Sequence, residues 1–132
     1  MINKIGVLTS GGDAPGMNAA IRGVTRYAIQ KGLTVEGIIR GYEGLLSHET
    51  RPLGRRDVGA IIHRGGTMLR TARCLEFKEK ETQKKAAAYL RELEIDALVV
   101  VGGDGSMRGA QALSRWGIPT ITIPGTIDND MM

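Results

Sequence analysis

The chain has 132 residues, including 19 glycines and a single cysteine, with 42% hydrophobic residues and a net charge of +4. This length and composition suit about one domain with a modest core, and the lone cysteine excludes an internal disulfide and favours a reducing cytoplasm. The glycine content is about twice the ~7% of ordinary proteins, but the glycines follow no three-residue period, which excludes collagen, and no apolar run approaches the ~20 residues of a membrane helix.

The first predicted elements are a strand and a helix joined by glycines. The apolar run over 4–9 predicts a short buried strand. A glycine-rich segment over 11–16 follows it. Apolar residues then recur at helical spacing and predict a helix over about 16–30, which Gly32 ends.

The middle of the chain shows weaker periodicity. Residues 34–39 predict a second strand, and residues 41–53 are expected to be irregular. Asp57 is a candidate cap for a short helix that runs to His63, and the pair of glycines at 65–66 would break that helix.

The last third repeats the strand–helix order. Residues 79–93 predict a helix, and the continuous apolar run over 97–101 predicts a strand that is covered on both faces. The glycine-rich segment 102–105 then leads into a helix over 106–116, and residues 120–123 predict a final strand.

This order of elements predicts an α/β fold, a three-layer doubly wound and mostly parallel sheet with helices on both faces. In such folds ligands bind beyond the carboxyl ends of the strands. The glycine-rich segments 11–16 and 102–105, together with Gly125, follow predicted strands. We therefore expect the functional site there.

Glycine-rich turns that open a helix admit two interpretations. The backbone approaches an anion closely and the helix N-terminus attracts it, or the glycines only make the turn possible. Neither turn has the G-x-x-x-x-G-K-[ST] pattern of a P-loop or a strict G-x-G-x-x-G. A standard P-loop protein is not indicated, and a dinucleotide dehydrogenase has weak support.

Carboxylates accompany two of these turns. Asp104 would repel phosphates unless a cation lies between, which indicates Mg²⁺, but it would also serve as an N-cap, as would Ser106. Asp128 and Asp130 follow the last strand, where one would act as a general base and the other as a metal ligand or orienting group. The simpler alternative for this pair is a solvated turn.

The arginines also allow two interpretations. Arg22 and Arg26 lie opposite the apolar stripe of the first helix, as a solvated face or as a site for an anion. Arg55 admits the same two readings. Arg73 would either reach a transferring phosphate or form a surface salt bridge. His48 lacks metal-ligand spacing and is expected at the surface.

Taken together, four segments closely resemble ATP-dependent 6-phosphofructokinases of the bacterial type, in the family's order and along essentially the whole chain. They are Lys4–Asn18 (KIGVLTSGGDAPGMN), Gly65–Arg73 (GGTMLRTAR), Gly102–Ser106 (GGDGS) and Pro124–Asp130 (PGTIDND). The resemblance implies transfer of the ATP γ-phosphate to the 1-hydroxyl of fructose 6-phosphate, a step of glycolysis in the cytoplasm.

The resemblance also implies residue roles. Asp128 matches the catalytic base, Asp104 matches the Mg²⁺ ligand, and Arg73 matches an arginine that binds ATP and stabilises the transferred phosphoryl group. The other residues that match nucleotide contacts are Gly12, Tyr42, Cys74, Gly103, Gly105 and Ser106. Those that match substrate contacts, besides Asp128, are Thr126, Ile127 and Asp130, and Thr126 also belongs to the catalytic set.

The resemblance also has implications for the phosphoryl donor and for allosteric regulation. Pyrophosphate-dependent relatives usually carry an acid at Gly105 and a lysine at Gly125, so glycine at both positions implies ATP. Arg22, Arg26 and Arg55 match the arginines of an allosteric site for ADP or phosphoenolpyruvate at a subunit interface of a homotetramer.

Family chains are more than twice as long as this one. The resemblance therefore implies that residues 1–132 are most of an N-terminal nucleotide-binding domain, without the substrate domain. The alternatives are a non-catalytic Mg-ATP-binding module, a pyrophosphate-dependent relative, and an NAD or lipid kinase, which shares GGDG but lacks PGTIDND. With five aromatic residues, nucleic-acid binding by base stacking is disfavoured, and no membrane contact is expected.

Overall fold

A computed structural model of the chain describes residues 2–10, 16–59, 68–69, 77 and 79–124, and for residues 104–106 the backbone alone. Its five strands form one sheet in the order β3-β2-β1-β4-β5. The strands are β1 (Lys4–Thr9), β2 (Thr34–Ile38), β3 (Thr50–Leu53), β4 (Ala97–Gly102) and β5 (Thr120–Pro124). All neighbours pair in parallel except β2 and β3, so the predicted mostly parallel sheet is confirmed.

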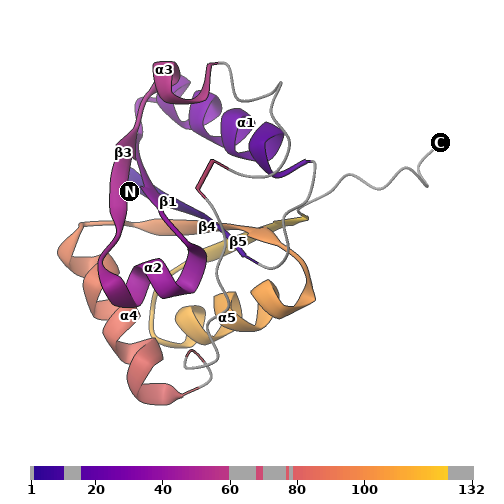
Figure 1. The fold of residues 1–132 in the computed structure, drawn as a ribbon. Helices are drawn as coiled ribbons and strands as arrows, with labels where there is room; N and C mark the ends of the chain where they lie inside the picture. Colours follow the sequence, from indigo (N-terminus) through magenta and orange to yellow (C-terminus); the bar gives the residue numbers. More distant parts are fainter. Residues whose placement is uncertain (1, 11–15, 60–67, 70–76, 78, 125–132) are drawn as a thin grey trace.

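Helices cover both faces of this sheet (Figure 1). They are α1 (Met17–Gln30), α2 (Gly41–Ser47), α3 (Arg55–Val58), α4 (Lys80–Glu92) and α5 (Asp104–Arg115). The buried side chains form two clusters: one joins the sheet to α1 and α3, and the other joins it to α2, α4 and α5. The three-layer prediction is therefore confirmed.

The strong patterns in the sequence correspond to real elements. Every residue of β4 is buried, as expected for a strand covered on both faces. On α1 the predicted core positions Met17, Ile21 and Ala28 are buried, and Gly32 ends the helix at a φ of 82°. Phe77 is buried in the core as well.

The prediction of irregular structure over 41–53 is wrong. This stretch contains α2 and β3. The helix includes two glycines and is only 7 residues long, so local propensity does not indicate it. Packing favours it instead, because Tyr42 and Leu45 are buried in the core. β3 is a short edge strand with exposed Arg51 and Pro52, and it therefore lacks an apolar alternation.

Two predicted helix starts also differ. Asp57 is not the N-cap of α3 but its third residue, and its carboxylate accepts the Gly54 N–H at 2.6 Å. Residues 60–63 of that predicted helix lie outside the described residues. α5 begins at Asp104 with Gly103 as its N-cap residue, so neither Asp104 nor Ser106 has the capping position.

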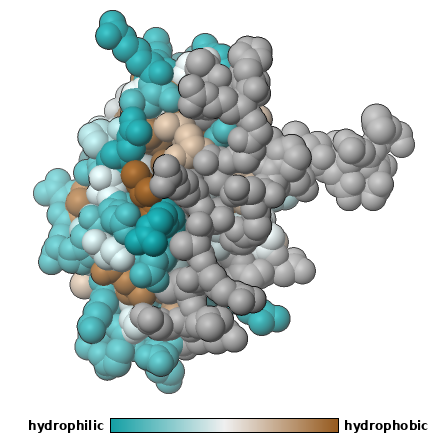
Figure 2. Space-filling model, viewed as in Figure 1, coloured by the Kyte–Doolittle hydropathy of each residue, from teal (hydrophilic) through white to brown (hydrophobic). Residues whose placement is uncertain are grey.

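Among the described residues on the face that Figure 2 shows, most of the surface is hydrophilic, and hydrophobic residues form small separate areas. None of the helices in the described ranges is long and apolar enough to cross a bilayer.

Candidate functional site

The order of the strands reverses between β1 and β4. The chain adds β2 on one side of β1, and then β4 and β5 on the other. In open α/β sheets, the crevice outside the carboxyl ends of two such strands is where ligands bind. The Ser10 N–H donates to the Val101 carbonyl oxygen at 2.9 Å, which holds these two strand ends side by side. The sheet thus brings the starts of two glycine-rich segments together.

The second of these segments opens α5. β4 ends at Gly102, Gly103 has an extended backbone, and α5 begins at the next residue. Among the described side chains none caps this helix, and a Cβ placed on exposed Gly103, its N-cap residue, would meet nothing within 4 Å. The first N–H groups of a helix have no partner within it and attract anions. The backbone here is suited to a phosphate group.

Helix α2 begins beside the same end of β1, because its first residue, Gly41, is in close contact with that strand. Gly41 has a φ of 59°, and a Cβ there would lie 2.8 Å from the carbonyl oxygen of Thr9. No residue with a side chain fits this position. This contact fixes the start of α2, and Tyr42 with it, beside the carboxyl end of β1.

Tyr42, which the resemblance assigns to the nucleotide, is 6% exposed. Its ring stacks on Phe77 with the ring centroids 4.4 Å apart, and it lies against Gly109 of α5. Burial raises the pKa of the Tyr42 hydroxyl above its usual value, because the low-dielectric surroundings disfavour the phenolate. Its ring thus links α2 and α5.

Several predicted site residues lie outside the described residues. They are Gly12, Arg73, Cys74, Thr126, Ile127, Asp128 and Asp130, together with Gly125. The backbones of Asp104, Gly105 and Ser106 form the first turn of α5, and their side chains are not described. Within the described ranges, no three His, Cys, Asp or Glu side chains gather where a metal ion would bind.

The three arginines assigned to an allosteric site come from two helices in contact, α1 and α3. Arg26 and Arg55 are exposed. Arg22 is half-buried rather than on an open face, and its Nε is buried without a hydrogen-bond partner among the described residues. An unpartnered guanidinium nitrogen is costly, and an anion would supply the missing acceptor.

Sequence reasoning missed Asn18. Its side chain is 3% exposed, and its Oδ1 accepts the backbone N–H of Met68 at 2.6 Å. The available signal was an amide at the buried edge of an apolar helix stripe, because buried polar side chains are almost always hydrogen-bonded. This contact joins α1 to the second of the four family segments, Gly65–Arg73.

His48 is exposed, as expected, and its ring stacks on Tyr89 of α4 with the centroids 4.0 Å apart. Trp116 is half-buried against the core, and its Nε1 donates to Gln83 Oε1 at 3.3 Å.

Comparison with known proteins identifies relatives along nearly the whole chain. Residues 4–132 match the family described as Phosphofructokinase. The ATP-dependent 6-phosphofructokinase 1 of Clostridium perfringens is 58% identical over 130 residues, and the ATP-dependent 6-phosphofructokinase of Caldanaerobacter subterraneus is 62% identical over 131. Each match covers 98% of this chain and 41% of the relative, so the chain spans about two fifths of the length of these curated relatives.

Solved structures agree. Phosphofructokinase from Pichia pastoris in the T-state matches with a TM-score of 0.90 and 39% identity, over 98% of this chain and 17% of that one. A pyrophosphate-dependent phosphofructokinase from Marinobacter aquaeolei matches with a TM-score of 0.74 over 93% of this chain and 33% of that one. Its identity is 22%, so this second likeness concerns the fold alone.

Proposed function

Because the chain belongs to the phosphofructokinase family, we propose that it is the nucleotide-binding part of an ATP-dependent 6-phosphofructokinase. The reaction transfers the γ-phosphoryl group of ATP to the 1-hydroxyl of fructose 6-phosphate, with ADP and fructose 1,6-bisphosphate as products, as a step of glycolysis in the cytoplasm. Residues 1–132 form most of the N-terminal domain, and the sugar-phosphate domain belongs to the part of the protein beyond them.

The observation that carries this proposal is the pairing of β1 and β4 at the point where the strand order reverses. Their carboxyl ends are joined through Ser10 and Val101. Gly12 follows the first of these ends and Gly103 the second, so the two phosphate-binding segments start from adjacent points. Phosphoryl transfer depends mainly on positioning and on neutralising charge. Two adjacent glycine-rich segments meet the first requirement.

ATP is the donor that the relatives favour. The curated relatives at 58% and 62% identity are named ATP-dependent. Glycine rather than a larger residue at positions 105 and 125 would leave the space that a nucleotide needs. Tyr42 and Cys74 belong to the nucleotide side of the site. Mg²⁺, held by Asp104, would neutralise phosphate charge when bound; the open backbone at Gly103, the N-cap residue of α5, fits a metal–phosphate group.

The chain's own residues then divide the chemistry. Asp128 accepts the proton of the sugar 1-hydroxyl while that oxygen bonds to the γ-phosphorus, and the bond to the oxygen that bridges the β- and γ-phosphates breaks. Arg73 stabilises the charge on the transferred group. Thr126, Ile127 and Asp130 hold the substrate, and the backbone at Gly105 and Ser106 supports the phosphates of ATP.

Separate measurements of binding and turnover test this proposal. Calorimetric titration of the 132-residue chain with Mg-ATP is expected to detect binding, and a coupled assay with fructose 6-phosphate reports turnover. Binding without turnover supports the non-catalytic Mg-ATP module for this chain. Phosphorylation driven by pyrophosphate and not by ATP would contradict the choice of donor.

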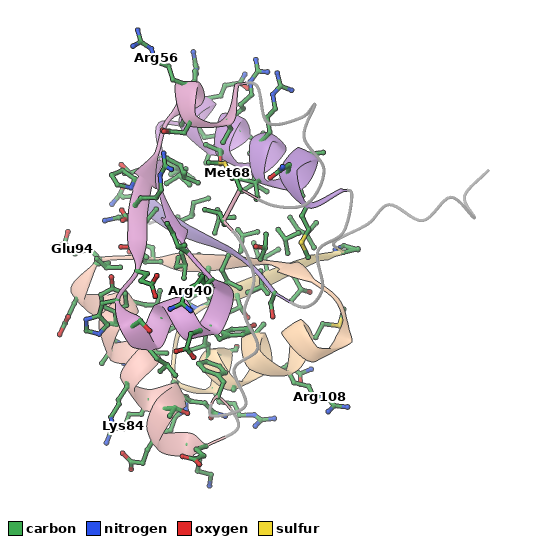
Figure 3. All side chains as sticks on the ribbon, viewed as in Figure 1. Arg40, Arg56, Met68, Lys84, Glu94 and Arg108 are labelled. Atoms are coloured by element: carbon green, nitrogen blue, oxygen red, sulfur yellow. The ribbon has the colours of Figure 1, made fainter. Side chains whose placement is uncertain are left out.

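The proposal extends to allosteric regulation through three arginines of α1 and α3. Arg22, Arg26 and Arg55 bind the phosphates of ADP or phosphoenolpyruvate at an interface of the homotetramer. The Nε of Arg22 is buried and has no hydrogen-bond partner in the part of the chain that the structure describes, which supports this assignment. Charge reversal at Arg22 and Arg55 is expected to abolish the response to effector. Arg56→Glu is the matched control, because Arg56 lies on the same helix as Arg55, α3, and points into solvent (Figure 3). Effector titrations unchanged by the Arg22 and Arg55 reversals would exclude this site.

A further inference from the structure

The side-chain amide of Gln83, on α4, joins two residues that are far apart in the sequence. Its Nε2 donates to the carbonyl oxygen of Phe77 at 2.9 Å, and its Oε1 accepts the indole N–H of Trp116 at 3.3 Å. Trp116 is the residue that ends α5. A side-chain amide donates only through its nitrogen and accepts only through its oxygen, so these two partners together fix its orientation. Gln83 therefore holds Phe77 and the end of α5 at once.

Phe77 extends this connection into the core. Its side chain is buried, and its ring stacks on Tyr42 with the ring centroids 4.4 Å apart and the ring planes at 26°. Aromatic rings at this separation attract one another beyond the effect of burial alone. Because Gln83 holds the backbone carbonyl of Phe77, it also determines where the Phe77 ring lies. The position of Tyr42 thus depends on Gln83 through a single intermediate residue.

Helix α5 is held at two places along its length by these contacts. Tyr42 packs on Gly109, near the middle of the helix, and Gln83 binds Trp116 at its end. At a rise of ~1.5 Å per residue, Gly109 and Trp116 lie ~10 Å apart along the helix axis. Two separated contacts fix the direction of a helix axis, whereas a single contact lets the helix pivot. They therefore determine where the first turn of α5, directly after Gly103, points.

We propose that Gln83 is a positioning residue of the nucleotide site: its amide fixes Phe77 against Tyr42 and Trp116 at the end of α5, and thereby aims the first turn of α5 at the bound phosphates. The inference rests on the proposed function for the identity of the ligand. Each contact from Gln83 to the backbone of α5 lies among the described residues. Hydrogen bonds from a helix start to an anion weaken steeply when the N–H groups point away from it. Release of Gln83 is therefore expected to weaken nucleotide binding.

Two substitutions separate the hydrogen bonds of Gln83 from its packing. Gln83→Met keeps the length of the side chain and loses both bonds. Gln83→Glu keeps an oxygen that accepts the Trp116 indole N–H, but it places a second oxygen against the Phe77 carbonyl, where a donor is required. Both variants are therefore expected to release Phe77, and only Gln83→Met is expected to release Trp116. Gln111→Glu adds the same charge at an exposed position of α5 and is the matched control for charge.

Calorimetric titration of the 132-residue chain with Mg-ATP measures the effect on binding. Both Gln83 variants are expected to raise the dissociation constant about fivefold, the loss expected from one hydrogen bond. Ile118→Val, a buried change just beyond α5, controls for a general loss of stability. This control and Gln111→Glu are expected to leave the dissociation constant nearly unchanged. A dissociation constant that either Gln83 variant leaves unchanged, or that Ile118→Val raises as much, overturns the inference.

Proton NMR gives a second measurement that needs no nucleotide. The nuclear Overhauser effect between the rings of Phe77 and Tyr42 is expected in the unmodified chain and is expected to be lost in both Gln83 variants. The indole N–H of Trp116, the one tryptophan of the chain, is expected to exchange about tenfold faster in Gln83→Met and to stay protected in Gln83→Glu. A ring contact that persists in Gln83→Met overturns the inference. If the unmodified chain binds no Mg-ATP while both variants lose the ring contact, the proposed function fails and the link from Gln83 to Tyr42 stands.

Discussion

The phenol ring of Tyr42 occupies the space where a side chain at Gly109 would be. A Cβ on Gly109 would lie 2.4 Å from Tyr42 Cζ and 2.7 Å from its hydroxyl oxygen. The ring therefore packs directly on the backbone of α5, with Phe77 stacked on it. This contact couples α2 to the helix whose first turn contains Asp104, Gly105 and Ser106.

Gly109→Ala is expected to destabilise the protein, although alanine is the better helix former. The methyl group would displace the Tyr42 ring, and overpacking of this kind costs about 1–3 kcal/mol. Gly23→Ala is the matched control, since Gly23 is also inside a helix and a Cβ there meets nothing within 4 Å. This control is expected to gain roughly 0.5–1 kcal/mol. Urea denaturation measures the free energy of unfolding of each variant. If both substitutions changed it in the same direction relative to the unmodified chain, the packing explanation would be contradicted.

Tyr42 also predicts how stability depends on alkaline pH. Burial raises the pKa of its hydroxyl in the folded state above the usual value of 10.0. The unfolded chain therefore releases this proton at lower pH. The stabilisation from the neutral phenol is complete below about pH 10 and declines as the pH rises further. Urea denaturation at pH 7 and pH 11 is expected to show a smaller alkaline loss for Tyr42→Phe than for the unmodified chain; an identical loss would argue against a buried phenol.

Thr25 is fully buried on α1, and its hydroxyl has no hydrogen-bond partner among the described residues. Thr25→Val keeps the shape and removes this polar group. The variant is expected to be more stable by about 1 kcal/mol. Thr25→Ser keeps the hydroxyl and loses the methyl group, so it is expected to be less stable than the unmodified chain. Thermal unfolding distinguishes these cases, and a destabilised Thr25→Val would show that the hydroxyl is bonded.

Asp96 joins the start of β1 to the start of β4. This contact lies at the amino ends of the two strands, opposite the proposed nucleotide site. Its Oδ2 accepts the N–H groups of Asn3 at 2.8 Å and Lys4 at 3.0 Å, and these bonds lower the pKa of the carboxyl below its usual value of 3.8. Its stabilising effect is therefore present above pH 4 or so and is lost as the pH falls below that. Asp96→Asn is expected to be less stable at pH 7 and to approach the unmodified chain at pH 2. Glu92→Gln, an exposed change on α4, is expected to differ little at either pH, and a gap for Asp96→Asn that persists at pH 2 would contradict the charge-based explanation.

The sequence predicts the parts of this fold in which one physical signal dominates. The uninterrupted apolar run of β4 and the helical stripe of α1 are such cases, and both are confirmed. No local sequence pattern predicts α2. The tertiary contacts of Gly41 and Tyr42 stabilise this helix instead. The position of Asn18 depends on a partner 50 residues away, which no spacing rule detects. The roles of Arg73 and Asp128 remain predictions from the motifs.

The most direct test of the central claim is an NMR titration of the chain with Mg-ATP that follows the backbone amides. The account predicts the largest shifts at Ser10, Gly103 and the first turn of α5, where β1 and β4 end side by side. The amides of Asn3 and Asp96, at the opposite edge, are expected to shift little. Saturable binding with its largest shifts at that opposite edge, or no response at Gly103, would contradict a nucleotide site at the carboxyl ends of these strands.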